Sequence, residues 1–354
     1  MKNICDMNSI QYKTMINKYG KEFEDVFNDI SINRDYSHCP IPILIKPEKK
    51  SLDDLKQLID EYNNENNTEL GISFKALFAL DVEVEGKKKV CKGEFLLAKT
   101  PRGVKVLEYF LKMICDEDWQ ELPPIIDNIC WTQIEHKSRK STDKNPKGCL
   151  LFTSDMGNID VFQKAFIKFI KERGLWDDCY VDYCNCKKSN KISETYENAL
   201  IRCKEEGKEI LLFLLNQQGG LGITYPKCDS VIMLDDSNNA EQYYQRIMRC
   251  MTESKNDEEP KTCGIIVDFN WKRQLMWIND LCKQVQTEGD THKLKQEILI
   301  NLVEHKIFKI NPRKHGKFGW DKQDISEYMN FISEQIQNET DEDLIWNGWT
   351  CPDT

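Results

Sequence analysis

Residues 209–235 read EILLFLLNQQGGLGITYPKCDSVIMLD, which is two apolar runs joined by a glycine-rich segment. The runs at 209–215 and 230–235 are apolar almost without interruption, whereas a strand with one solvent-facing side alternates apolar and polar residues. Uninterrupted apolar strands are typical of parallel sheets that helices cover on both faces. The stretch therefore predicts an α/β fold class.

The sequence on either side continues this alternation of strands and helices. Within 157–173, for example, Phe162, Phe166 and Phe169 recur at the spacing of one helix face. Because such sheets bind ligands at the carboxyl ends of their strands, we expect functional residues there. The predicted strands are 148–154, 179–184, 209–215, 230–235 and 263–269, and the predicted helices are 157–173, 192–207, 239–252 and a segment after 270.

The composition is that of an ordinary globular protein of 354 residues, with 40% hydrophobic and 31% charged residues. No apolar run reaches the roughly 18 residues of a membrane span, and no apolar signal-peptide core is present, so we expect no membrane partner. Fifteen scattered cysteines then indicate reduced intracellular thiols. The net charge of −10 argues against coating nucleic acid by electrostatics alone, although a local basic surface is compatible with it.

Residues 242–253, QYYQRIMRCMTE, have the period of an amphipathic helix. This period predicts one polar face and one buried face, and the two arginines of the polar face could be solvated or aimed at phosphates. The glycines of 219–223 could likewise form a simple turn or a backbone site for a ligand. The predicted polar face carries Gln242, Gln245, Arg246 and Arg249, and the predicted buried face carries Tyr244, Ile247, Met248 and Met251.

The order and spacing of these features resemble the second RecA-like lobe of superfamily 2 helicases and Swi/Snf-type translocases. In that family a strand leads to a glycine-rich turn called motif V, as at 209–223. The next strand ends in an aspartate, here Asp235, and Asn239 follows at the family's spacing. Gln245 comes ten residues after the aspartate, in the arginine helix called motif VI. The stretch 147–166 resembles motif IV, so the resemblance implies a RecA-like parallel sheet.

The resemblance implies that part of this lobe faces ATP held on another lobe. Arginines suit this role because phosphoryl transfer needs positive charge at its transition state. The implied catalytic residues are Arg249 and Arg246, and the implied ATP-binding residues are Gln245, Gly220, Gly222 and Asp235.

A second set of residues would contact DNA or RNA, and the resemblance leaves open which of the two it is. It also leaves open whether the chain unwinds or translocates. The implied nucleic-acid-binding residues are Ser154, Asn216, Gln217 and Asn239. Asn239 has a purely structural alternative, because it could cap the following helix in a capping box with Gln242.

The chain departs from the family pattern at three points. The full arginine pattern has a third arginine where this chain has Thr252, which leaves open whether hydrolysis is impaired. The turn before the glycines is one residue short and lacks the usual Ser/Thr and Ala. No G-x-x-x-x-G-K-[ST] loop occurs, and Asp60-Glu61 lies in a charged helical segment and does not end a strand. ATP and magnesium would therefore be bound mainly by a partner lobe that bears the Walker motif.

Three functions fit these features. The first is the C-terminal lobe of an ATP-dependent helicase or translocase, not catalytic alone, in a longer protein or encoded as a separate piece. The second is a non-catalytic subunit that keeps the lobe's fold and binds nucleic acid or a protein. The third, an unrelated doubly wound enzyme, leaves the Asp-Asn-Gln-Arg spacing unexplained. Without an export signal, we expect an intracellular protein, cytoplasmic or nuclear. The acidic balance and the abundance of Asn, Lys and Ile resemble helicases of large cytoplasmic DNA viruses, which adds a viral factory or virion as an expected location.

Three parts are predicted along the chain: an N-terminal segment 1–95 that resembles the exit from a first helicase lobe, the RecA-like lobe 96–275, and a helical extension 276–354 with an acidic tail. The prolines of 40–50 predict an extended connector, and helices are expected at 51–67, 100–114 and 294–308. Cys179, Cys184 and Cys186 match the spacing of no common zinc site, so no metal site is predicted.

Overall fold

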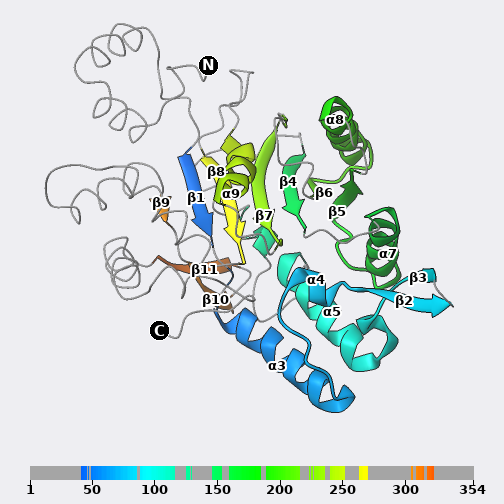
Figure 1. Ribbon diagram of the computed structural model, residues 1–354. Helices are drawn as coiled ribbons and strands as arrows, with labels where there is room; N and C mark the ends of the chain where they lie inside the picture. The colour runs from blue at the N-terminus through cyan, green and yellow to red at the C-terminus, as the bar shows by residue number, and fades with distance from the viewer. Residues whose placement is uncertain are drawn as a thin grey trace, which may run out of the picture.

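A parallel sheet forms the centre of the molecule, which we describe from a computed structural model (Figure 1). The sheet has seven strands in the order β5-β6-β4-β7-β8-β1-β9, and every pair is parallel. The described residues are 41–45, 47, 49–85, 88–115, 125–127, 129, 146–153, 159–184, 189–215, 223, 225, 227–235, 240–251, 263–269, 304–305, 308–314 and 317–322. The strands are β1 (Ile41–Ile45), β4 (Lys147–Phe152), β5 (Cys179–Tyr183), β6 (Ile210–Leu215), β7 (Cys228–Met233), β8 (Cys263–Asp268) and β9 (Glu304–His305).

Side chains of the central strands alternate between two hydrophobic cores, one on each face of the sheet. In β4, for example, Leu151 belongs to the first core, whereas Leu150 and Phe152 belong to the second. This alternation follows from the two-residue period of a strand. Both sets are buried because helices cover both faces, so the predicted RecA-like α/β fold class is confirmed.

The helices divide between the two cores as their apolar stripes require. Helices α3, α4, α5 and α7 supply side chains to the first core, and α8 and α9 supply the second. Thr100 caps α5 by accepting a hydrogen bond from the Gly103 amide over 3.0 Å, and Pro101 takes the first helical position. The helices are α3 (Lys49–Asn66), α4 (Phe74–Leu77), α5 (Pro101–Ile114), α7 (Ile159–Glu172), α8 (Ser189–Glu205) and α9 (Ala240–Ile247).

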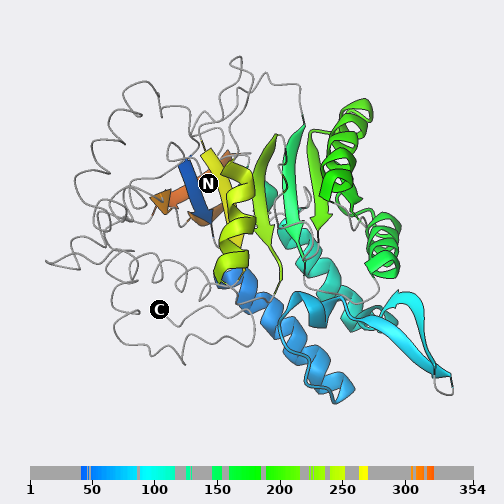
Figure 2. The same ribbon diagram turned by 45° about the horizontal axis from the view of Figure 1, so that its top comes forward.

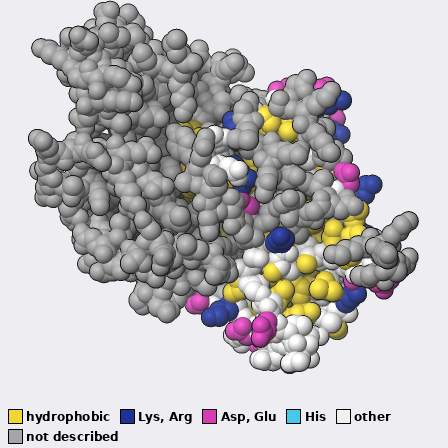
Figure 3. All heavy atoms as spheres, viewed as in Figure 1, with side chains coloured by type: hydrophobic (Ala, Val, Ile, Leu, Met, Phe, Trp, Pro, Cys, Tyr) yellow, Lys and Arg dark blue, Asp and Glu magenta, His cyan; other side chains and the backbone are white. Residues whose placement is uncertain are grey.

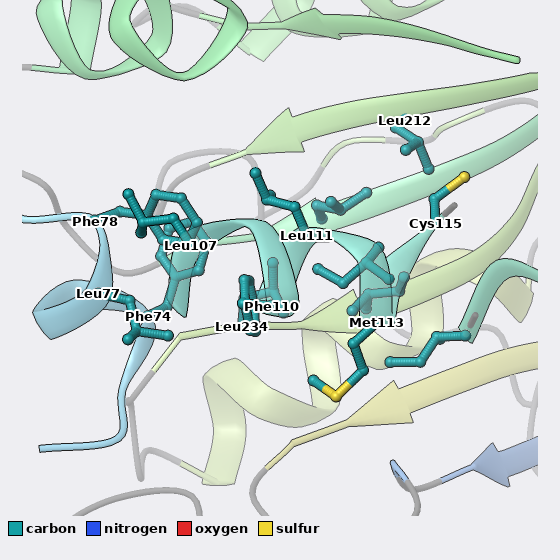
Figure 4. Packing of buried hydrophobic residues seen from close by; sticks show 14 of the residues in the cluster. Phe74, Leu77, Phe78, Leu107, Phe110, Leu111, Met113, Cys115, Leu212 and Leu234 are labelled. Atoms are coloured by element: carbon teal, nitrogen blue, oxygen red, sulfur yellow. The ribbon is translucent and has the colours of Figure 1, made fainter. Parts of the chain in front are cut away.

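The first core joins the segment before residue 95 to the parallel sheet. Phe74 and Phe78 from α4 lie against Phe110 of α5 and Phe166 of α7, with ring centroids 5.2–6.4 Å apart. Figure 4 shows Phe74, Leu77 and Phe78 close to the side chains of α5, with Leu234 beside Phe110. Residues on both sides of the boundary predicted at residue 95 therefore share one core.

A hairpin of β2 (Leu80–Glu85) and β3 (Lys88–Phe95) projects from this layer and continues into the short helix η3 (Leu97–Lys99). Figure 2 shows the hairpin extending past α5. Val82 and Leu96 are among the exposed large apolar side chains. Figure 3 shows apolar side chains of the described residues gathered at the lower right of the view, with charged groups around them.

Two predictions about the flanking segments are wrong. The stretch expected to be a connector contains β1, which pairs in parallel with β8 from Ile41↔Cys263 to Ile45↔Val267. Because β9 pairs only with Ile43 and Leu44, β1 is almost an edge strand, where proline is tolerated. The helix predicted at 294–308 is contradicted at 304–305, which form β9, and at 308, where β10 begins.

The part expected to be a helical extension contains an antiparallel hairpin. Its strands are β10 (Phe308–Lys314) and β11 (Lys317–Lys322), which pair from Phe308↔Lys322 to Lys314↔Lys317. The apolar residues of this stretch are too few and too close to glycine to sustain a helix, whereas a tight hairpin suits them. The helix predicted after 270 and the acidic tail lie outside the described residues.

The helix lengths and compositions also bear on membrane association. Within the described ranges, no helix combines the length and the apolar character that crossing a membrane requires.

Candidate functional site

The predicted motif VI helix lies over the second face of the sheet, against β7 and β8. It consists of α9 followed by the short helix η5 (Met248–Met251). Figure 1 and Figure 2 both show it crossing these two strands. Gly264 of β8 permits this approach, because a Cβ at that position would lie 2.4 Å from the Cys250 carbonyl oxygen and 2.7 Å from the sulfur of Met251.

The buried stripe of this helix differs from the predicted one. Tyr243, Arg246, Ile247 and Cys250 are buried, at the i, i+3, i+4, i+7 spacing of a single helix face. Met248 and Met251, which were predicted to be buried, are only partly so. The prediction failed because it assigned the arginine to the polar face on its side-chain type alone. The helix therefore turns a guanidinium toward the sheet.

Arg246 forms an ion pair with Asp235, the residue at the carboxyl end of the β7 run. Arg246 Nη1 lies 2.5 Å from Asp235 Oδ2, and each residue is 2% exposed. Asp235 lies two residues after Met233 and four after Val231, both in the second core. The two-residue period of the strand therefore turns its carboxylate toward α9. The Arg246 guanidinium also lies 5.5 Å from the centroid of the Phe152 ring.

This pairing places two of the predicted site residues in direct contact. Burying both charges requires that each neutralise the other, because an unpaired buried charge costs several kcal/mol, on the order of 3–5. The Arg246 charge is thus compensated within the lobe and does not lie at the surface. The ATP-related roles implied for Arg246 and Asp235 stay predictions, and their observed contact fixes α9 to the end of β7.

Arg249, one turn further along, reaches in a different direction. Its Nη1 donates a hydrogen bond to the Ile223 carbonyl oxygen over 2.6 Å. Ile223 is the last residue of the glycine segment that resembles motif V, so this bond joins that segment to the helix that resembles motif VI. Arg249 is partly buried, and burial lowers the pKa of its guanidinium, although the neighbouring Tyr225 opposes that shift.

Gln245 completes the group of predicted residues that the structure brings together. It is partly exposed on α9, beside Arg246 in the sequence and one turn before Arg249. Asp235, Gln245, Arg246 and Arg249 therefore belong to one region, formed by the end of β7 and the helix that follows it. The other predicted site residues and the position of the family's third arginine lie outside the described residues, namely Ser154, Asn216, Gln217, Gly220, Gly222, Asn239 and Thr252.

Sequence reasoning missed several residues that support this region. The backbone amide and the hydroxyl of Thr153 both donate to the Leu215 carbonyl oxygen, over 2.8 and 3.2 Å. These bonds tie the end of β4 to the end of β6, next to the predicted contacts at 154 and 216–217. Asp268, fully buried at the end of β8, lies opposite Met233 in the sheet register. The position of Thr153 after an apolar strand was a signal that could have revealed it.

Among the described residues, no group of three or more His, Cys, Asp or Glu side chains is arranged to hold a metal ion. Cys179, the first residue of β5, belongs to the first core, and Cys184, which directly follows β5, belongs to the second, so the two thiols lie on opposite faces of the sheet. These two thiols therefore cannot share one ion. The arginine region has donors suited to phosphate oxygens and not to a metal.

Comparisons with known proteins give only distant likenesses. No protein-family model matches the chain. No curated protein matches it. Domain 2 of the DEAD-box helicase Mss116p, solved bound to an RNA duplex, matches with 13% identity over 50% of this chain and 68% of that chain, at a TM-score of 0.24.

Two further solved structures cover more of the chain. The C-terminal part of the Fun30 ATPase domain matches with 13% identity over 96% of this chain and 77% of that one, at a TM-score of 0.26. Dbp5 of S. cerevisiae, bound to RNA and ADP BeF3, matches with 9% identity over 89% and 86%, at a TM-score of 0.24. Likenesses at this level do not identify a function for this chain.

Proposed function

We propose that this chain is the C-terminal lobe of an ATP-dependent nucleic-acid helicase or translocase. It would act on ATP and magnesium held mainly by a partner lobe that bears the Walker motif. The observation that supports this most is the hydrogen bond from Arg249 to the Ile223 carbonyl oxygen, because it joins the two segments that resemble motifs VI and V. A helicase lobe has to couple its nucleotide side to its nucleic-acid side, and this bond would be a direct physical link between them.

The two arginines would have different roles. Arg246 neutralises Asp235 and holds α9 against β7, so it would position the helix without touching phosphate. Arg249 keeps one nitrogen on the Ile223 carbonyl oxygen and is partly exposed, so its guanidinium would contact the phosphates across the interface between lobes. When bound, ATP with magnesium supplies the phosphoryl group and the metal charge on it. The lobe would supply a pre-positioned cation at the developing negative charge.

A second function is supported by the burial of Arg246. Because the Asp235 carboxylate already neutralises this arginine, only one of the two predicted catalytic arginines is left for phosphate. A lobe that had lost hydrolysis could keep the same buried pair for stability alone. This second proposal is a non-catalytic subunit that binds nucleic acid or a protein through the helicase-lobe fold. The resemblance to viral helicases stays a prediction under either proposal.

The two functions predict different results when the chain is mixed with a polypeptide that carries a Walker loop and a strand-ending Asp-Glu. Such a polypeptide would be sought beside or upstream of this reading frame. The helicase proposal predicts that the mixture hydrolyses ATP faster when single-stranded DNA or RNA is added. The second proposal predicts nucleic-acid or protein binding with no increase in hydrolysis over the Walker polypeptide alone. If nucleic acid stimulated ATP hydrolysis by the Walker polypeptide equally well in the absence of this chain, that result would contradict the helicase proposal.

A further inference from the structure

Two cysteines far apart in the sequence lie side by side in the first core. The sulfur atoms of Cys115 and Cys179 are 3.3 Å apart, within a thiol–thiol hydrogen bond. Cys115 ends α5, where its amide donates to the Leu111 carbonyl oxygen over 3.0 Å. Cys179 is the first residue of β5, at one end of the strand order. The pair therefore connects the helical layer to the outermost strand on that side.

The backbone around both cysteines is held by a shared acceptor. The Trp176 indole N–H donates to the same Leu111 carbonyl oxygen over 2.8 Å, and the Cys179 amide donates to the Trp176 carbonyl oxygen over 2.9 Å. Figure 4 shows Cys115 with its sulfur beside Leu212 of β6. Because these hydrogen bonds hold the backbone at both cysteines, the two thiols are kept close to each other.

We infer that Cys115 and Cys179 are a reversible oxidation site that forms a disulfide joining α5 to β5. The two sulfur atoms need to approach by only about 1.2 Å to reach the bonded separation of roughly 2.05 Å, which a small rotation of each side chain supplies. The two thiols are also more exposed, at 9% and 7%, than the buried cysteines of the second core. Small oxidants therefore reach this pair before they reach those thiols.

The oxidant is a peroxide, and the reaction balances in two steps. The sulfur of the more exposed Cys115 attacks one peroxide oxygen and breaks the O–O bond, which gives a sulfenic acid and one water. The sulfur of Cys179 then attacks the Cys115 sulfur and displaces its oxygen, which leaves as a second water with the thiol proton. Two thiols and one hydrogen peroxide thus give one disulfide and two waters, and a thiol reductant reverses the bond.

The disulfide would stabilise the lobe by closing a loop of 64 residues between its two cysteines. A cross-link of that span raises the midpoint of thermal unfolding by about 5–10 °C when it is formed without strain. It would also limit any movement of α5 relative to β5. The pair is thus a site at which an oxidising environment would make the lobe more rigid.

Peptide mapping tests the inference on the unmodified chain. The folded protein is treated with a small excess of hydrogen peroxide, alkylated, and digested with trypsin and an endoprotease that cleaves before aspartate. This digestion isolates each cysteine, Cys115 in the fragment 113–115 and Cys179 in 178–181. We expect the two fragments to be joined, to separate on reduction, and to come from a monomeric band on a non-reducing gel.

Variants supply the controls. Cys115→Ser and Cys179→Ser should each abolish the joined fragments and the peroxide-induced rise in the unfolding midpoint, whereas Cys91→Ser removes a more exposed thiol and should leave both unchanged. The inference is overturned if both cysteines of the folded wild-type protein are recovered as alkylated thiols or as separate higher oxides. Cross-links from either cysteine to other partners would overturn it equally. Peptide mapping of the wild-type protein tests the inference by itself, so it still decides the question if a serine variant fails to fold.

Discussion

The carboxylate of Asp235 and the guanidinium of Arg246 meet in the second core, 2.5 Å apart and 2% exposed. The pair joins the end of β7 to the middle of the helix that carries the remaining arginine. It therefore stabilises this region and neutralises one of the two arginines of that helix.

Removing one partner of the pair should be strongly destabilising. Arg246→Ala leaves the Asp235 carboxylate buried without its counter-ion, so we expect a loss of about 3–5 kcal/mol in the free energy of unfolding. Replacing both residues, as Asp235→Leu with Arg246→Met, should restore most of that loss, because no charge is then left buried. Urea unfolding followed by circular dichroism measures both effects.

A more exposed ion pair of nearly the same length provides the control. Arg202 Nη2 lies 2.6 Å from Asp182 Oδ2, with the arginine side chain half exposed. Arg202→Ala should cost less than about 1 kcal/mol. If the Arg202 and Arg246 variants lost equal stability, the buried pair would not be holding α9 in place.

The contact between Gly264 and η5 should be equally sensitive. Gly264→Ala places a Cβ 2.4 Å from the Cys250 carbonyl oxygen, so the helix carrying Arg249 has to move away from β8. We expect a loss of about 1–3 kcal/mol, as for other overpacked sites. Thermal unfolding of Gly264→Ala is compared with Gly71→Ala, where the added Cβ meets nothing within 4 Å. A Gly264 variant no less stable than the Gly71 variant would contradict the packing of η5 on the sheet.

Stability should fall in alkaline solution through Cys203. Burial raises the pKa of this thiol from 9.0 to about 11, while a hydrogen bond with the Tyr180 backbone lowers it in part. Between pH 9 and 11 the unfolded chain therefore gives up a proton that the folded chain keeps, and the free energy of unfolding decreases as the pH rises. Below pH 9 this contribution is fully present. Cys203→Ala should reduce the loss between pH 9 and 11 by about 2 kcal/mol, measured by urea unfolding at each pH. An unchanged pH profile in that variant would contradict the assignment.

The central sheet was predictable from the sequence because its strands β4, β6, β7 and β8 are buried on both faces. Uninterrupted apolar runs such as 210–215 carry that signal without any knowledge of tertiary contacts. The sequence pattern missed β1, since Pro42 argues against a strand unless the neighbouring strand is short. The length of β9 is a property of the assembled sheet, and no local pattern in 41–45 reveals it.

The site was predictable in its location but not in the orientation of its side chains. The resemblance to the helicase lobe predicts Asp235, Gln245, Arg246 and Arg249 as one group, and the structure brings them into one region. The burial of Arg246 depends on a carboxylate eleven residues earlier that neutralises it. Helical periodicity alone assigns every arginine to the polar face. Only the two-residue period of the strand, which puts Asp235 on the same face as Val231 and Met233, could have indicated this partner.

The proposed role of Arg249 is tested most directly by nucleic-acid-stimulated ATP hydrolysis in the mixture with the Walker-bearing polypeptide. Arg249→Ala should lower the stimulated rate by about a hundredfold or more while nucleic-acid binding stays within a few-fold, since its charge acts on the transition state. Arg173→Ala, which removes an exposed arginine paired with Glu108, should leave the rate unchanged. Stimulated hydrolysis that survives intact in Arg249→Ala would contradict the central claim that this arginine contacts the phosphates.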